Sequence, residues 1–158
     1  MKTSELIRVI GLTVVGGVLM FVLQPALYTN RLIRISDLQG KVDAWVSNYY
    51  MPGALTVFLA SVVALVIWLV SNRFSKAHRA DEVDRWRIIW WLVGLIPVLA
   101  ILAAIFLFKG SDGALPSLTT FFVLDGLWLY WLTTVTSTPF PFTYLPPLAP
   151  QIRGLIGA

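Results

Sequence analysis

The chain has 158 residues, of which 58 % are apolar and only 13 % are charged, and its mean hydropathy is +0.79. Soluble domains carry about a quarter charged residues, so this composition excludes an ordinary globular domain and indicates a membrane protein. The net charge of +4 includes no basic run of the nucleic-acid-binding type, and the absence of cysteine excludes disulfides and thiolate sites.

Four segments are long and apolar enough to cross a bilayer as helices. A helix needs about 20 apolar residues to cross a hydrocarbon core about 30 Å thick, and an open sheet would leave backbone groups unpaired in lipid. We therefore predict an all-α integral membrane protein, with a four-helix transmembrane domain at 1–138 and a proline-rich tail at 139–158. The predicted spans cover residues 6–28, 52–70, 88–108 and 117–136.

The first span has one feature of a signal peptide, because Lys2 and Arg8 precede its apolar stretch. Glu5 lies between them, however, and residues 24–27 offer no cleavage site of the small-residue type. We expect this segment to be retained as a membrane span.

The connection after the first span has apolar and aromatic residues at helical spacing. Ser36 could cap a helix that begins at Asp37, which would lie in the interface with Trp45 and Tyr49 among the lipid headgroups. Gly40 weakens this prediction. The alternative is a polar loop with an aromatic anchor.

The connection between the second and third spans mixes acidic and basic residues with the single histidine, His78. Its spacing matches no metal motif, so ion pairs such as Asp84 with Arg87 are favoured over a metal site or an acid–base pair. Trp86, Trp90 and Trp91 are predicted to mark the membrane entry of the third span. The acidic residues considered with His78 are Asp81, Glu82 and Asp84.

The tail contains five prolines between residues 139 and 150, which favour an extended path over a regular helix. Its other residues include Phe140, Phe142 and Tyr144, which are too apolar for a free tail in water. We expect the tail to lie on the membrane surface or to dock on a partner protein.

Asp125 is the only charged residue in the apolar run 121–132. Counted at about 1.5 Å per residue it lies near mid-bilayer, where a charged carboxylate costs at least about 2.5–3.5 kcal/mol. No Lys or Arg reaches this depth. The candidate partners are the side chains of Gln24, Ser61 and Trp128 and the backbone carbonyl that Pro97 leaves free.

Three roles for Asp125 remain open at this stage. A protonated aspartic acid could donate a structural hydrogen bond between helices. Alternatively, its carboxyl could face a partner chain, or it could line a route for protons or cations.

Basic residues favour one side of the membrane over the other, because eight lie on the side of both termini and four lie on the opposite side. The positive-inside rule then predicts that both termini are cytoplasmic, in a bacterial inner membrane or a related internal membrane. The eight are Lys2, Arg8, Arg73, Lys76, Arg79, Arg85, Arg87 and Arg153, and the four are Arg31, Arg34, Lys41 and Lys109.

The sequence offers little chemistry for catalysis. No span contains a histidine for a haem, no glycine pattern fits a nucleotide, and no serine has a base beside it. We therefore predict a non-catalytic subunit that assembles or stabilises a larger membrane protein complex. It would contact lipid and either other subunits or further copies of itself, with bound lipid but no other cofactor and no nucleic acid.

Two further functions stay open. An oligomeric ion or proton channel, or a transporter component, would use several copies of Asp125 around a pore. A lipid-acting enzyme would use the acidic residues of the connection between the second and third spans. For an assembly subunit, we expect the contact surfaces to be the tryptophan-rich third and fourth spans and the tail.

Overall fold

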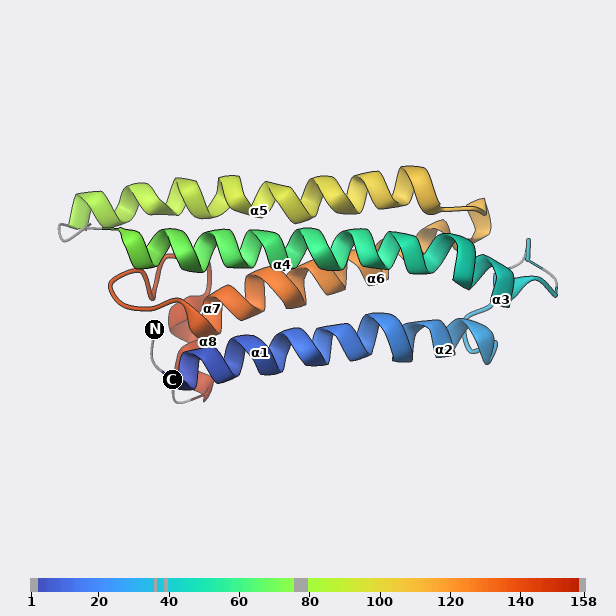
Figure 1. Ribbon diagram of the computed structural model, residues 1–158, viewed down its shortest axis with the longest axis horizontal. Coiled ribbons are helices and arrows are strands. Elements are labelled where there is room, and N and C mark those ends of the chain that lie inside the picture. The colour runs from blue at the N-terminus through green and yellow to red at the C-terminus, as the bar shows by residue number, and fades with distance from the viewer. Residues whose placement is uncertain (1–2, 36, 39, 76–79, 157–158) are drawn as a thin grey trace.

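The structure is a computed structural model that describes residues 3–35, 37–38, 40–75 and 80–156 (Figure 1). The described residues form helices and loops, without strands, which confirms the all-α prediction. Four helical stretches are long and apolar enough to cross a membrane, and each extends beyond its predicted bounds. They are Thr3–Thr29, Val42–Phe74, Glu82–Phe108 and Asp112–Ser137.

Three of these spans contain π-helical turns between their α-helical parts. The first span comprises α1 (Thr3–Val18), η1 (Leu19–Leu23) and α2 (Gln24–Thr29). The second comprises α3 (Val42–Trp45), η2 (Val46–Tyr50) and α4 (Met51–Phe74), and the third is α5 (Ala80–Phe108). The fourth comprises the 3₁₀ turn η3 (Asp112–Ala114), α6 (Leu115–Gly126), η4 (Leu127–Leu132) and α7 (Thr133–Ser137), and α8 (Ala149–Ile156) follows it.

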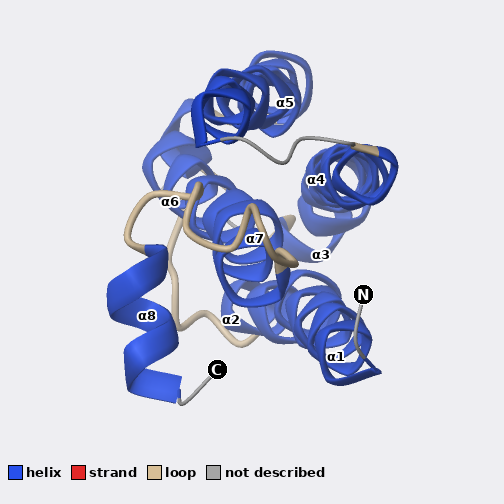
Figure 2. Ribbon diagram, turned by 90° about the vertical axis from the view of Figure 1, so that its left-hand side faces the viewer, coloured by secondary structure: helices blue, strands red, loops and turns tan. Residues whose placement is uncertain are grey.

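The fourth span is the centre of the bundle. Figure 2, which looks along the helices, shows α6 and α7 surrounded by α1, α4 and α5. Half of the most apolar stretch of this span is buried (50 %), against 11 % for the first span and 17 % for the third. A residue on the inner faces of the fourth span is therefore shielded from lipid by the chain itself.

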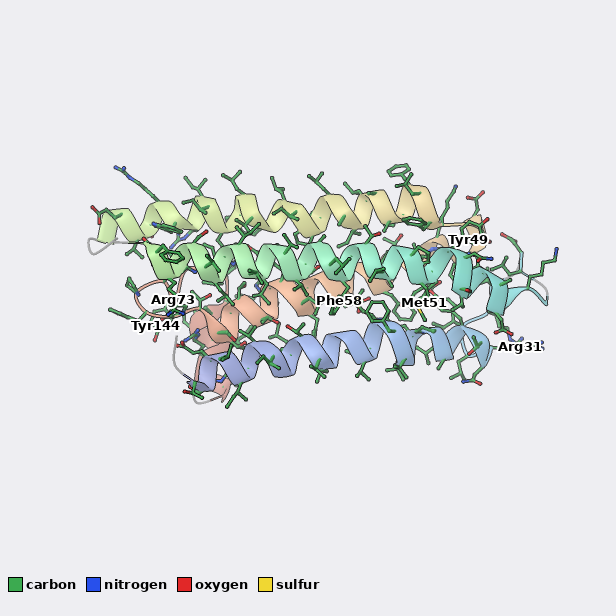
Figure 3. All side chains as sticks on the ribbon, in the orientation of Figure 1. Arg31, Tyr49, Met51, Phe58, Arg73 and Tyr144 are labelled. Atoms are coloured by element: carbon green, nitrogen blue, oxygen red, sulfur yellow. The ribbon has the colours of Figure 1, made fainter. Side chains whose placement is uncertain are left out.

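Both ends of the chain lie at the same end of the bundle, which we call the terminal end. The last turn of α4 and the first turn of α5 also lie there, as do the labelled side chains of Arg73 and Tyr144 (Figure 3). Arg31 and the loops at 30–41 and 109–114 lie at the other end, which we call the loop end. The spans are thus antiparallel along the chain, as the sequence predicts.

The helix predicted within the first loop is not a separate element. Helical structure begins at Val42 and runs without a break through α3 and η2 into α4. The indole of Trp45 is buried, donates a hydrogen bond of 2.8 Å to the Lys109 carbonyl, and packs edge-on against Tyr28 at 5.1 Å. Gly40 has a φ of +78°, a turn conformation that ends the preceding loop. Trp45 therefore packs inside the protein at this end of the bundle, and its depth at the lipid headgroups stays a prediction.

The tail also differs from its predicted extended path. Residues 140–148 form successive turns, and α8 then begins at Ala149, with Pro150 in its first turn, where the missing N–H is harmless. Phe142 is fully buried with its ring centroid 5.1 Å from that of Trp86, whereas Phe140 is 89 % exposed. The tail thus docks on its own bundle with one face. Contact of the other face with lipid or a partner remains a prediction.

Aromatic residues form the core at both ends of the bundle. At the loop end, Tyr28 and Tyr50 pack against Trp45, and Phe122 packs against Tyr50. At the terminal end, Trp68, Trp90 and Tyr130 pack with the tail residue Phe142. Rings of this size bury much apolar surface, and buried indole and phenol groups need a polar partner.

The first and fourth spans approach closely at Gly16. A Cβ atom added there would lie 2.5 Å from Leu129 Cδ2 and 3.2 Å from Trp128 Cδ1, and Leu129 is itself fully buried. A small residue at this position lets the two backbones pack against each other.

Replacing Gly16 with Val should lower the stability of the purified protein in detergent by about 1–3 kcal/mol, because the new side chain overpacks the contact with Leu129. Gly11→Val, on the same helix, is the matched control, since nothing lies within 4 Å of a Cβ built at Gly11. Thermal or denaturant unfolding measures both. Equal stabilities for the two variants would contradict the close packing at Gly16.

Candidate functional site

A chain of hydrogen bonds inside the bundle joins the first, second and fourth spans. Gln24 Nε2 donates to Asp125 Oδ1 at 2.7 Å, and the hydroxyl of Tyr50 donates to Gln24 Oε1. The same hydroxyl lies 3.1 Å from the backbone carbonyl of Met20. All three side chains are buried, and Asp125 is only 4 % exposed. We call Gln24, Tyr50 and Asp125 the polar triad.

The hydrogen bonds of the triad all point in one direction. Tyr50 donates to Gln24, and Gln24 donates to Asp125, so the carboxyl group accepts at the end of a polarised chain. In a medium of low dielectric such chains strengthen each link. The arrangement favours negative charge on Asp125 Oδ1, although the only donor to this oxygen among the described residues is the neutral amide of Gln24.

π-Helical turns adjoin every member of the triad. Gln24 follows η1 directly, Tyr50 is the last residue of η2, and Asp125 lies two positions before the start of η4. Such turns are rare, and they occur often at functional sites because each shifts the side chains that follow it around the helix axis. Their shared position indicates that three helices are locally adjusted around one group of polar residues.

The second oxygen of Asp125 has no hydrogen-bond partner among the described residues, and neither has the hydroxyl of Ser61. Both atoms are buried, and an unsatisfied buried polar group costs about 1–3 kcal/mol. Asn72, deeper toward the terminal end on the same α4 helix, shows the same property at both of its polar atoms. The interior of the bundle therefore contains buried polar atoms, on Ser61, Asn72 and Asp125, that have no hydrogen-bond partner among the described residues.

Of the four candidate partners of Asp125, Gln24 is the one that hydrogen-bonds to its carboxyl among the described residues. Gln24 contacts Asp125, as proposed from depth counting. Trp128 instead donates its indole N–H to the Leu12 carbonyl at 3.0 Å, which joins α1 to the fourth span. The hydroxyl of Ser61 makes no hydrogen bond to Asp125 within the described part of the chain.

The residues predicted as interfacial anchors occupy different environments. Trp90 is buried and donates to Thr134 Oγ1 at 3.1 Å, and Trp86 is half-buried between Trp68 and Phe142. Trp91 and Tyr49, in contrast, are exposed. Trp45 and Trp90 are buried in the protein core, whereas Trp91 and Tyr49 have rings available to lipid headgroups. The membrane depth of all these residues stays a prediction.

Two arginines cap the carboxyl end of the fourth span. Arg153 of α8 donates from Nε to the Val135 carbonyl at 2.7 Å and from Nη2 to the Thr138 carbonyl at 2.6 Å. Arg8 of α1 donates to the Thr136 carbonyl at 3.2 Å. The last carbonyls of a helix lack partners inside the helix, and positive charge there is favoured by the helix dipole.

Burial lowers the pKa of the Arg153 guanidinium, and the nearby Glu5 carboxylate opposes that shift. A guanidinium remains protonated at physiological pH, so the cap keeps its charge. Arg8, Arg153 and α7 together join α1 to α8.

The acidic residues between the second and third spans do not form a site within the described residues. Among those residues no group of three His, Cys, Asp or Glu side chains could hold a metal ion. Asp84 pairs with Arg87 at 3.3 Å in the exposed part of α5, which confirms one predicted ion pair. His78 and the side chain of Asp81 lie outside the described part of the chain.

Tyr50 is the triad member that sequence reasoning did not find, because its position beside Tyr49 indicated a headgroup anchor. A usable signal was present in the sequence. Residues 42–50 have the spacing of a helix that joins the second span without a breaking residue until Pro52, which suits a first helical turn. Extending the second span to this segment would have buried one of the two tyrosines.

The chain matches no protein-family model, no curated protein and no solved structure. The geometry of the triad and of the surfaces therefore carries the functional argument.

Asp125 and Gln24 should be energetically coupled. In a double-mutant cycle with Asp125→Leu and Gln24→Leu, we expect a coupling free energy of about 0.6–1.7 kcal/mol, the range for side-chain hydrogen bonds between membrane helices. Reversible unfolding in mixed micelles measures the four proteins. Thr120→Leu paired with Asp125→Leu is the control, because Thr120 is exposed and bonds to its own helix. Additive effects in both cycles would argue against the hydrogen bond.

Proposed function

We propose that this protein is a non-catalytic, multi-pass membrane subunit that assembles with other membrane proteins and stabilises them. The outer surface of α1 carries this proposal. It is an apolar face that uses glycine and β-branched side chains, and the bundle leaves it uncovered. Ile7, Gly11, Val14, Val18 and Val22 are all exposed and follow one stripe along the helix.

A face of this kind suits contact with another helix. Association of helices in lipid depends on close packing, which small side chains permit, because lipid and protein are equally apolar. Val and Ile are also already restricted in a helix, so ordering them against a partner costs little entropy. The opposite face of α1 packs on the fourth span through Gly16, so the helix could bridge its own bundle and a partner.

The arrangement of polar groups supports the same function. The triad and the capping arginines face the interior of the bundle and are bonded within the chain. The surface that remains for a partner in the membrane is apolar. A protein of this design acts on its surroundings through shape and packing.

The proposed orientation places the terminal end in the cytoplasm of a bacterial inner membrane or a related internal membrane. Described arginines at that end are Arg8, Arg73, Arg85, Arg87 and Arg153, and described basic residues at the loop end are Arg31, Arg34, Lys41 and Lys109. In the full sequence the count is eight basic residues on the side of the termini against four on the other side, which is the bias that the positive-inside rule associates with cytoplasmic loops.

Val14→Trp should disrupt assembly without unfolding the bundle. Val14 is exposed, so a large side chain there obstructs a partner and not the core. We expect wild-type protein purified in mild detergent to carry a membrane partner at fixed stoichiometry, and Val14→Trp to reduce that yield about tenfold. Leu99→Trp, at an exposed position of α5, is the matched control. A wild-type chain that purifies alone, or equal yields from both variants, would contradict the proposal.

Ion or proton handling is the alternative function, and the unpartnered Oδ2 of Asp125 is the observation that favours it. An ionisable residue within the membrane often marks an ion pathway. The placement of Asp125 against Gln24 within one bundle does not favour a pore ringed by several copies. A pathway through a single bundle would have to pass Ser61 and Asn72.

Reconstituted vesicles separate the two functions. Under an imposed potassium diffusion potential, vesicles that contain wild-type protein should acidify no faster than empty vesicles, and Asp125→Asn should not change the rate. Proton or sodium flux that wild-type protein supports and Asp125→Asn abolishes would replace the assembly function by the alternative. Asn keeps the hydrogen bond to Gln24 but cannot ionise, so the comparison isolates the charge.

A further inference from the structure

A lateral groove of about 670 Å³ lies between α5 and the fourth span. Apart from Thr119 its lining is apolar or aromatic, and it includes Trp91, Val98 and Ile105 on one wall and Val123 and Leu127 on the other. Most of these side chains are half-exposed, so the groove opens sideways toward the hydrocarbon. From Trp91 to Ile105 it extends about 21 Å along α5, more than the roughly 15 Å of one leaflet.

A basic residue stands at the terminal end of this groove. Arg87 precedes Trp91 by four residues and Gly94 by seven, so it lies on the groove-facing stripe of α5, about 6 Å beyond Trp91. Its side chain is 59 % exposed and uses one nitrogen in the pair with Asp84. A guanidinium has five N–H donors in all, so several remain for an anion.

The tail decides which kind of molecule fits. Pro147 and Leu148 line the groove at its terminal end, and Trp131 holds the tail there through a hydrogen bond of 3.1 Å to the Pro147 carbonyl. A partner helix that continued out of the membrane would meet this segment. A lipid does not need the groove to continue past the tail, because its acyl chain ends at this level and is followed by the headgroup.

We propose that the groove binds one anionic phospholipid from the leaflet at the terminal end. Its acyl chain lies between α5 and the fourth span, and its phosphate accepts hydrogen bonds from Arg87. Trp91 packs at the junction of headgroup and chain, where amphipathic rings are favoured. This site lies on a different surface from the α1 stripe, so it does not depend on the assembly function.

Lipid retention tests the proposal with paired variants. The protein is exchanged into mixed micelles with equal phosphatidylglycerol and phosphatidylcholine, and retained lipid is counted by native mass spectrometry. Wild-type protein should retain one phosphatidylglycerol in preference to phosphatidylcholine. Arg87→Gln should reduce that preference about fivefold. Arg85→Gln removes the same charge two residues away, on another side of α5, and should leave the preference unchanged.

The groove itself is tested by filling it. Val98→Trp should reduce retention of both lipids, whereas Leu99→Trp, on the neighbouring exposed stripe, should not. Val98 is half-exposed, and unchanged thermal unfolding verifies that the variant is folded. Equal effects of Arg85→Gln and Arg87→Gln would indicate diffuse attraction to anionic lipid and overturn the site. No phosphatidylglycerol preference in the wild type, or full retention in Val98→Trp, would overturn it as well.

Discussion

The hydrogen bond between Gln24 and Asp125 meets the strictest constraint on this bundle, which is that hydrocarbon offers no partner to a polar group. A carboxyl at mid-bilayer must be bonded by protein. The chain achieves this for Oδ1 of Asp125, by placing the residue on its central span and by bringing α2 and η2 against it, whereas Oδ2 has no partner among the described residues. Burial of the fourth span, the approach at Gly16 and the π-helical turns are all consistent with that requirement, because each helps the three spans to meet at one depth.

The same constraint applies at the terminal end, where the buried polar groups that need partners are hydroxyl side chains and helix carbonyls. All five residues of α7 are buried, and so is Thr138, which follows them. Tryptophan N–H groups supply part of the hydrogen bonding of these hydroxyl side chains. Trp68 donates to Thr138 and Trp90 to Thr134. Tryptophan therefore serves two purposes in this chain, since it fills the apolar core and carries a donor to hydroxyl groups that lipid could not satisfy.

Sequence alone predicted the class of fold and the number of spans, because apolar length follows from residue counting. It named Gln24 as one of four candidate partners of Asp125 without choosing among them. It did not predict Tyr50, the docking of Phe142 or the burial of Trp45 and Trp90. An aromatic residue at the end of a span suits a headgroup and a protein core equally well. Which of the two it occupies depends on the rotation of its helix and on distant acceptors such as the Lys109 carbonyl. Residue counting gives neither the rotation of a helix nor the position of a distant acceptor.

The cap that Arg153 provides has a consequence for biosynthesis. Its acceptors, the carbonyls of Val135 and Thr138, precede it by 18 and 15 residues. Until residues 147–153 have left the ribosome, α7 lacks the cap from Arg153. The groove between α5 and the fourth span then also lacks the lining that Pro147 and Leu148 provide at its terminal end. The packing of α8 against α7 can therefore form only after α8 itself has been made. A fusion protein joined behind Ile156 must leave α8 free to turn back.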